Sequence, residues 1–168
     1  YQHDTGPTVI TAPYLFKELF ELFNEDIENY INFVPLNPWY RFYFDDFSFF
    51  DYGGTKESTV NEIKKFSSRD ADGYLKMLES SKNIYEIGYD KLATFPFHNF
   101  SNMVKILPDM IKLRSFTNVY NHVSKFIKNE NLRKAFSIQP LLVGGNPFTT
   151  TSIYCLIHYL ERKDGIHF

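Results

Sequence analysis

The pattern of apolar and polar positions predicts helices along most of the chain. Apolar residues recur at intervals of three and four, the spacing that gives a helix one apolar face. In residues 12–23 the polar residues Lys17, Glu18 and Glu21 fall opposite that face, and Pro13 suits a first helical turn. By the same spacing we predict further helices near residues 58–66, 70–90, 117–128 and 130–136, and a last one that begins near Phe148.

The helix predicted near 70–90 is the longest of these. Its start is marked by Ser67 or Ser68 followed by Asp70, because a hydroxyl before a helix and an acid in its first turn interact with free backbone N–H groups. Beyond it, Pro108 interrupts the helical pattern. The residues predicted to face the core are Ala71, Tyr74, Leu75, Leu78, Tyr85, Tyr89 and Leu92 in the long helix, and Ile153, Leu156, Ile157 and Leu160 in the last one.

A second kind of pattern, rich in aromatic and β-branched residues, predicts a few short strands. We place them near 31–35, 39–44 and 47–52, the last two joined by a turn at Asp45 and Asp46. Pro35 and Pro38 indicate an edge or a bend between the first two, and Val9 and Ile10 read as a short opening strand. The predicted fold class is therefore α+β, mostly helical with a small antiparallel sheet.

Composition adds an open question about the aromatic residues. The 168 residues suffice for one domain with its own core or for part of a larger one, and 18 Phe and 12 Tyr are about twice ordinary usage. One interpretation is a core rich in Phe. The other is a wall for a long apolar ligand, because rigid rings give a large contact area at low entropy cost.

Charge is distributed unevenly along the chain. The net charge is −2, so no overall field favours nucleic acid as a partner, but residues 1–94 carry −7, residues 95–134 carry +5 and residues 135–168 carry none. Residues 103–116 place Lys105, Lys112 and Arg114 among apolar side chains, typical either of a helix lying on a membrane surface or of an ordinary surface helix.

The same totals predict where the protein works. No run of 18 apolar residues crosses a bilayer and no signal peptide opens the chain, so we expect a cytoplasmic protein, peripheral to the membrane at most. The single cysteine, Cys155, fits a reducing compartment, and its place in a helical pattern indicates a buried side chain rather than a nucleophile.

Few residues suggest chemistry on their own. The turn Gly144-Gly145-Asn146-Pro147 is predicted to open a helix, where its amides could face an anion or a ring edge, or it only reverses the chain. It matches neither G-x-G-x-x-G nor a P-loop. His158 and Glu161 lie three apart but have no second pair of ligands, so we expect no metal site. No serine or cysteine partner can be assigned to the remaining histidines, His3, His98, His122 and His167.

Several longer stretches are more specific. "DTGPTVIT" with a helix directly after it, "YINFVPLNPWYRFYF", "LRKAFSIQPLLVGGNPFTTTSIYCLIHYLER" and the closing "GIHF" together resemble the bacterial-type phytoene desaturases, which are FAD-dependent carotenoid desaturases. The resemblance runs from residue 4 to the last residue with essentially no gaps, and residues 144–148 are its most specific part.

This resemblance implies a fold and a domain assignment. The family has an amine-oxidase-like FAD fold in which a dinucleotide-binding domain and a substrate domain alternate along the chain. The chain then looks like an internal fragment, since the dinucleotide fingerprint is not in it. Residues 1–12 would be a remnant of the FAD-binding domain, 13–164 the substrate-binding domain with 95–134 facing the membrane, and 165–168 the start of the return to the FAD domain.

The resemblance also implies chemistry and site residues. The reaction is hydride abstraction from a long polyene precursor onto the flavin, so the implied cofactor is FAD, held only in the full-length enzyme, and the implied partners are a carotenoid or isoprenoid substrate and a membrane surface. The fragment alone is expected to be inactive. The matching cofactor residues are Asp4, Gly6, Pro7 and Thr8, and the matching substrate residues are Tyr40, Arg41, Gly144, Gly145, Asn146, Pro147 and Phe148.

Two positions depart from the family pattern. Asn102 occupies the position of a candidate acid/base aspartate, and an amide cannot exchange a proton at neutral pH, so no catalytic residue is assigned. Phe47 matches the usual glycine of the turn between two strands, so the turn of that hairpin is expected to differ from the family pattern.

The alternative function is a non-catalytic helical module that binds membranes or apolar ligands.

Overall fold

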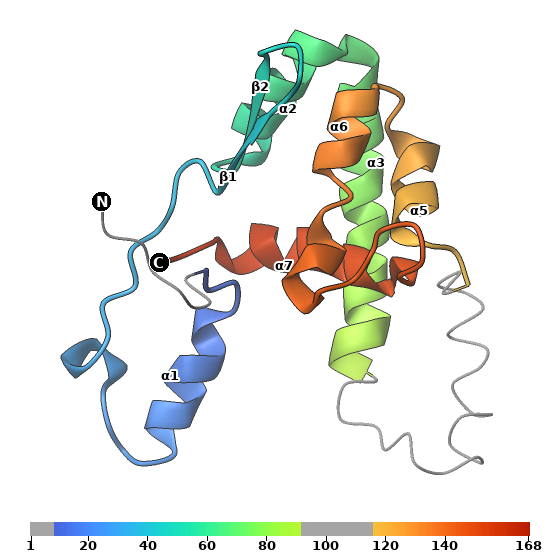
Figure 1. The fold of residues 1–168 in the computed structure, drawn as a ribbon. Coiled ribbons are helices and arrows are strands. Elements are labelled where there is room, and N and C mark those ends of the chain that lie inside the picture. The colour runs from blue at the N-terminus through green and yellow to red at the C-terminus, as the bar shows by residue number, and fades with distance from the viewer. Residues whose placement is uncertain (1–8, 92–115) are drawn as a thin grey trace, which may run out of the picture.

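The computed structural model describes residues 9–91 and 116–168 of the chain. Helix α3 is the long central element, and α7 crosses it (Figure 1). The hairpin of β1 and β2 lies beside α2 on one side, whereas α5 and α6 follow one another along α3 on the other (Figure 1). The helices are α1 (Pro13–Glu21), α2 (Lys56–Phe66), α3 (Ser68–Tyr85), α5 (Val119–Phe126), α6 (Glu130–Ala135) and α7 (Leu156–Asp164), with short turns of other helix types η1 (Ile27–Asn29), η2 (Glu86–Lys91), η3 (Gln139–Val143) and η4 (Ser152–Cys155).

The fold class and most of the predicted helices are confirmed. Helix α1 begins at Pro13, as its place in a first turn predicts, and α2, α3, α5 and α6 fall within the other predicted ranges or a few residues beyond them. Helix α3 ends earlier than predicted, at Tyr85, and continues as the π-helical η2. Its predicted core residues Ala71, Tyr74, Leu78 and Tyr85 are buried, but Leu75 is 45% exposed, so that assignment was wrong.

The last predicted helix begins later than the periodicity indicated. Residues 146–150 form a turn, η4 starts only at Ser152, and the α-helix starts at Leu156. The turn is closed by Asn146, whose carbonyl accepts hydrogen bonds from the amides of Thr149 and Thr150. Thr151 then caps η4 by accepting a bond from the amide of Ile153. The prediction that the Gly144-Gly145 turn opens a helix is therefore wrong.

The sheet is a single hairpin. Strand β1 (Tyr40–Tyr43) pairs antiparallel with β2 (Phe49–Tyr52), with Tyr40 opposite Tyr52 and Arg41 opposite Asp51. This confirms two of the four predicted strands and the turn between them. Phe47, where the family pattern has glycine, keeps a left-handed backbone conformation (φ 62°) although it has a side chain, and that side chain is 96% exposed.

The prediction of a strand near 31–35 is wrong, because among the described residues this segment forms an isolated bridge with the far end of the chain. Its amides and carbonyls exchange bonds with residues 166–168, including Val34 N to Phe168 O at 2.8 Å and Phe168 N to Val34 O at 2.8 Å. On the other side of that terminal segment, Ile10 and His167 exchange two bonds of 2.8 and 2.9 Å. Residues near both ends of the chain therefore lie side by side.

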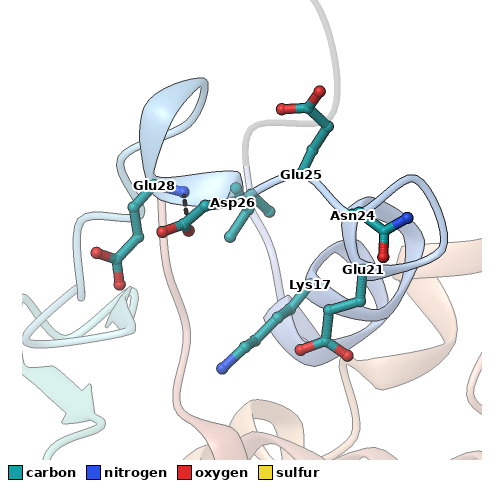
Figure 2. Close-up of a pocket in the computed structure, with 7 residues that line it drawn as sticks. Lys17, Glu21, Asn24, Glu25, Asp26 and Glu28 are labelled. Carbon is teal, nitrogen blue, oxygen red and sulfur yellow. Dashed lines mark hydrogen bonds between the residues drawn. The ribbon is translucent and has the colours of Figure 1, made fainter.

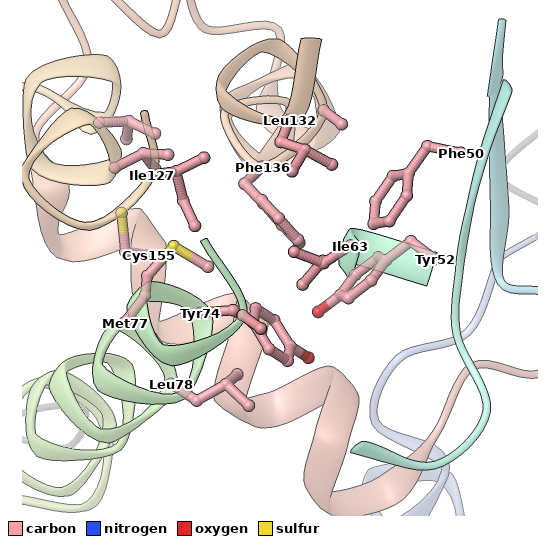
Figure 3. Close-up of a cluster of buried hydrophobic side chains, with 14 of the residues drawn as sticks. Phe50, Tyr52, Ile63, Tyr74, Met77, Leu78, Ile127, Leu132, Phe136 and Cys155 are labelled. Carbon is pink, nitrogen blue, oxygen red and sulfur yellow. The ribbon is translucent and has the colours of Figure 1, made fainter. Parts of the chain in front are cut away.

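The core is a cluster of aromatic and aliphatic side chains between the hairpin, α3, α5, α6 and α7. Figure 3 shows the rings of Phe50, Tyr52, Tyr74 and Phe136 meeting at its centre, and all four are at most 1% exposed. The Tyr74 and Phe136 rings stack with centroids 5.3 Å apart. Cys155 lies in the same cluster, and burial raises the pKa of its thiol to about 12, so the prediction of a buried structural cysteine is confirmed.

The high aromatic content serves both the core and the surface. Beside the buried rings, several large side chains are exposed among the described residues, and they gather on α1, on the hairpin and around residues 141–148. They include Phe16 and Leu19 on α1, Leu22 and Phe23 directly after it, Tyr43, Phe47 and Phe49 on the hairpin, and Leu141, Leu142, Val143 and Phe148.

Candidate functional site

Tyr40 and Arg41 lie on opposite faces of the hairpin, because successive residues of a strand point to opposite sides. Arg41 is on the solvent face, where it forms two bonds of 2.7 Å to the Asp51 carboxylate and stands over the ring of Phe49 at 4.7 Å. Tyr40 points inward and stacks on Tyr52. One ligand therefore cannot contact both side chains from the same side of the strand.

The hydroxyl of Tyr40 donates a hydrogen bond of 3.1 Å to Oε1 of Glu161 on α7. Glu161 is fully buried, and burial raises the pKa of its carboxyl to about 7, although Tyr40 and Arg162 act in the opposite direction. Burial and the nearby Glu161 also raise the pKa of Tyr40. Other polar atoms surround the carboxyl, since the side chains of Gln139 and Tyr52 both lie beside it.

Arg162, the next residue on α7, points to a different set of partners. Its guanidinium donates to the Tyr74 hydroxyl at 2.9 Å, to the Gly54 carbonyl at 2.6 Å and to the Thr59 hydroxyl at 2.5 Å. The group also lies over the ring of Trp39 at 4.4 Å, a cation–π contact. Arg162 thus ties α7 to α2, to α3 and to the start of β1.

His158 completes this group of buried polar residues, one turn before Glu161. Its Nε2 lies 2.9 Å from the Phe136 carbonyl and its Nδ1 lies 3.2 Å from Nε2 of Gln139. Burial lowers the pKa of the imidazole to about 4, so His158 is neutral near neutral pH. A carbonyl only accepts, so Nε2 carries the proton and Nδ1 accepts from the Gln139 amide. The sequence offered one signal for this group, the spacing of His158 and Glu161, but not their partners Gln139 and Tyr40.

The two glycines of the turn at 144–148 are required for different physical reasons. Gly144 ends η3 in a left-handed conformation (φ 68°), and nothing lies within 4 Å of where a Cβ would stand. At Gly145 a Cβ would stand 2.7 Å from Oγ1 of Thr150 and 3.2 Å from the Pro140 carbonyl. The atoms that approach Gly145 in the described part of the chain are therefore those of the chain itself.

The backbone amides of Gly144, Gly145 and Phe148 in this turn are already bonded. Gly144 N donates to Leu141 O at 3.0 Å and Gly145 N donates to Pro140 O at 2.7 Å. The amide of Phe148 donates to the Asn146 side chain at 2.9 Å, and Asn118 donates to the Phe148 carbonyl at 2.8 Å. A phosphate group would have to displace these bonds, so the turn does not offer the free amides of a phosphate site.

The side chains around the turn form an exposed apolar surface. Leu141, Leu142, Val143 and Phe148 are 50 to 65% exposed, and we call these four residues the turn surface. Phe148 packs on the ring of Tyr120 with centroids 4.6 Å apart, which holds one side of this surface against α5. The turn surface joins the buried polar group through η3, because Gln139 contacts His158 and its neighbour Pro140 accepts the bond from Gly145.

A polar pocket of about 610 Å³ lies between α1 and η1, as Figure 2 shows. It is lined by Lys17, Glu21, Asn24, Glu25, Asp26, Ile27 and Glu28, a charged lining that does not suit an apolar ligand. In the described parts of the chain no cluster of side chains is arranged to ligate a metal ion. Within the same residues, no helix combines the length and the apolar composition that crossing a bilayer requires.

Several predicted site residues lie outside the described residues. They are the proposed cofactor residues Asp4, Gly6, Pro7 and Thr8, the substituted position Asn102, and the basic residues Lys105, Lys112 and Arg114.

Comparison with known proteins identifies relatives over the whole chain. A phytoene desaturase (lycopene-forming) from Pantoea ananas is 41% identical over 168 residues, and one from Pseudescherichia vulneris is 42% identical over 168 residues; each match covers 100% of this chain and 34% of the relative. A third, from Paracoccus sp. (strain N81106 / MBIC 01143), is 41% identical over 165 residues, 98% of this chain and 33% of the relative. The chain spans about a third of the length of the curated relatives it matches. No protein-family model matches it.

Proposed function

The chain is a homologue of the phytoene desaturases that corresponds to about a third of their length, and we propose that it forms the substrate-binding part of an FAD-dependent carotenoid desaturase. The observation that carries this proposal beyond homology is the turn surface. Four apolar side chains are exposed within and directly before residues 144–148, the part of the chain that most specifically resembles the family. A long polyene needs such an apolar wall, because it offers no groups for hydrogen bonding.

In this proposal residues 144–148 shape the wall of the substrate tunnel beside the flavin. The bonded amides of Gly144 and Gly145 support an apolar rather than a phosphate contact at this turn. Gly145 then acts by letting the chain fold tightly on itself, so that Leu142, Val143 and Phe148 present their side chains outward. Tyr40 would act from the inner face of β1, through its bond to Glu161, and Arg41 from the outer face.

When bound, FAD supplies the acceptor for the hydride removed from the polyene. The described residues contain no phosphate-binding loop, and the amides of Gly144 and Gly145 are bonded within the chain, so the pyrophosphate would be held elsewhere in the full-length protein. Asp4, Gly6, Pro7 and Thr8 remain the proposed contacts to the flavin, while the apolar side chains of this chain would orient the substrate and exclude water.

The domain assignment is part of the same proposal. Residues 1–12 and 165–168 would connect to the FAD-binding domain, and residues 13–164 would form the substrate domain. The paired bonds between Ile10 and His167 support it, because two crossings between the same two domains are expected to lie side by side. We further propose that residues 95–134 contact the membrane surface, on the grounds of their net charge of +5.

Turnover by the full-length protein, in cells that accumulate phytoene, tests this function. We expect coloured carotenoids from the wild type and at least a tenfold loss from Leu142→Asp, because a carboxylate in the tunnel wall repels the polyene. Leu75→Asp, at a similarly exposed leucine on α3, is the matched control and should keep the activity. A full-length protein that forms no conjugated product and carries no flavin would instead favour a non-catalytic module that binds apolar ligands.

A further inference from the structure

The carboxyl of Glu161 is buried without a cation bonded to it. It is 0% exposed, and the ion pairs formed among the described residues do not include it. Arg162 is next to it in sequence, but its three donor nitrogens are bonded to Tyr74, Gly54 and Thr59. A carboxylate in such a place has a high desolvation cost, whereas a protonated carboxylic acid does not.

Three buried polar atoms lie at or beside this carboxyl, and none of them makes a hydrogen bond of good geometry among the described residues. They are Oε2 of Glu161, Oε1 of Gln139 and the hydroxyl oxygen of Tyr52. The neighbouring hydrogen bonds fix the orientation of the Gln139 amide, so its oxygen is the atom that faces Glu161. Phe136 O takes the proton of His158 Nε2, so Nδ1 of His158 takes a proton from Gln139 Nε2, and Oε1 of Gln139 is left needing a donor.

From this arrangement we infer that Glu161 is a neutral carboxylic acid in the folded protein and positions both Tyr40 and the start of η3. Its Oε1 accepts from the Tyr40 hydroxyl, and its Oε2 carries the proton and donates it to the acceptor Oε1 of Gln139. Glu161 therefore joins β1 to the segment that carries the turn surface. The part of this inference that concerns substrate positioning rests on the proposed function. The protonation of Glu161 does not depend on it.

The groups that face Glu161 are consistent with a bound proton. Tyr40 from β1 and Tyr52 from β2 are neutral, because burial raises the pKa of each above its ordinary value. On α7, His158 is neutral and Arg162 is the one charged group in this set. Tyr74 from α3 lies one contact further away, bonded to Arg162.

The sign of the pH dependence follows from the direction of the shift. The carboxyl has a pKa of about 7 in the folded protein and an ordinary pKa of 4.5, so between these values the folded state holds a proton that the unfolded state has released. The stabilisation is complete below about pH 4.5 and is lost as the pH rises through 7. His158 changes in the opposite sense over an overlapping range, because its pKa is lowered.

Comparison with Glu161→Gln isolates this contribution, since the other groups are common to both proteins. Glutamine reproduces the protonated acid: its oxygen accepts from Tyr40 and its NH2 group donates to Gln139. We expect the folding equilibrium constant of the wild type, divided by that of Glu161→Gln, to fall about tenfold per pH unit between about pH 4.5 and 7 and to be constant above. A ratio that does not change with pH would overturn the inference.

Infrared spectroscopy of the full-length protein tests the proton directly. At pH 6 we expect the carbonyl stretch of a protonated carboxylic acid, shifted by ¹³C-glutamate labelling and absent from Glu161→Gln. If only carboxylate bands respond to the labelling, Glu161 is ionised and the inference is wrong; the labelling experiment decides this in the wild type even if the variant does not fold.

Activity separates the positioning role from the proposed function. Glu161→Gln should keep the turnover of the wild type, whereas Glu161→Ala should lose at least tenfold, because it leaves Tyr40 and Gln139 without their partner. Equal losses in both variants would contradict positioning by a neutral acid. If the full-length protein shows the infrared band of the acid but desaturates no polyene, the protonation of Glu161 stands and the proposed function is wrong.

Discussion

The carboxylate of Asp70, near the start of α3, bonds the backbone amide of Asn129 at 2.7 Å, across 59 positions of sequence. Its second oxygen accepts from the amide of Lys128 at 2.9 Å. Asp70 is 1% exposed, so it holds the loop between α5 and α6 from inside the protein. The sequence identified Asp70 as a mark of the helix start but gave no indication of these distant partners.

Substitution of Asp70 should therefore cost more than loss of a helix cap. We expect Asp70→Ala to lower the free energy of unfolding by about 2–4 kcal/mol, because two buried amides lose a charged acceptor. Asp70→Asn keeps one acceptor oxygen and should lose about half of that. Asp72→Asn, an exposed position on the same helix, is the control and should stay within about 0.5 kcal/mol. Denaturant unfolding measures all three, and equal effects at positions 70 and 72 would contradict this role.

Replacement of Phe47 by glycine, the residue that the family pattern has at this position, should raise the stability of the protein. Phe47→Gly is expected to stabilise the protein by about 0.5–1 kcal/mol, because glycine adopts a φ of 62° without strain and the exposed ring makes no core contact to lose. Phe47→Val should destabilise it, since a β-branched residue tolerates this conformation least. Thermal unfolding measures the change. Asp45→Gly, at a neighbouring position without positive φ, should not stabilise the protein.

The two glycines of the turn should respond differently to alanine. Gly144→Ala is expected to cost about 1 kcal/mol, the strain of a left-handed conformation with free space around it. Gly145→Ala should cost about 2–3 kcal/mol, because its Cβ overlaps Thr150 and crowds the Pro140 carbonyl. Thr150→Ala should relieve part of the second cost but none of the first, and a double-mutant cycle measures that coupling.

In the full-length protein, Gly145→Val should abolish desaturation. Because the clash is with the chain itself, FAD content and stability should fall together with activity. Assays of bound flavin and of turnover on a polyene check this. A folded, flavin-loaded variant that loses turnover alone would mean that the valine blocks the tunnel, and near-normal turnover would contradict the proposed place of this turn.

Membrane contact by residues 95–134 should depend on charge. Reversal of Lys105, Lys112 and Arg114 to glutamate is expected to weaken binding to anionic liposomes, and added salt should weaken binding of the wild type, because both reduce the attraction to the lipid surface. Reversal of three exposed lysines on α2 and α3, Lys56, Lys64 and Lys76, is the matched control. If liposome flotation changes neither with salt nor with the reversal of Lys105, Lys112 and Arg114, residues 95–134 do not mediate membrane contact.

The 168-residue chain purified alone should carry no flavin. It has no dinucleotide fingerprint, and the amides of Gly144 and Gly145 are bonded within the chain, so only contacts to the ring remain. The absorbance spectrum of the purified chain measures this. A yellow preparation with bound FAD would show that the ring contacts suffice.

The sequence by itself determined the helices, the hairpin and the resemblance to the phytoene desaturases. Helices α1, α2, α3, α5 and α6 were predicted because each carries a regular apolar face, and that periodicity is a local property of the chain. The hairpin was predicted for the same reason, from neighbouring aromatic segments. The resemblance to phytoene desaturases was confirmed by relatives that match over the whole chain.

Only the tertiary structure decided where the later segments begin and which polar groups meet. The turn at 146–150 delays α7 because Asn146 and Asn118 hold it, and periodicity carries no information about side chains that bond the backbone. Residues 34–36 pair with 166–168 rather than forming a strand with their neighbours, since such pairing depends on the path of the chain between them. Tyr40, Gln139 and Glu161 likewise meet from three distant segments, and burial, which gives Glu161 its raised pKa, exists only once those segments have packed together.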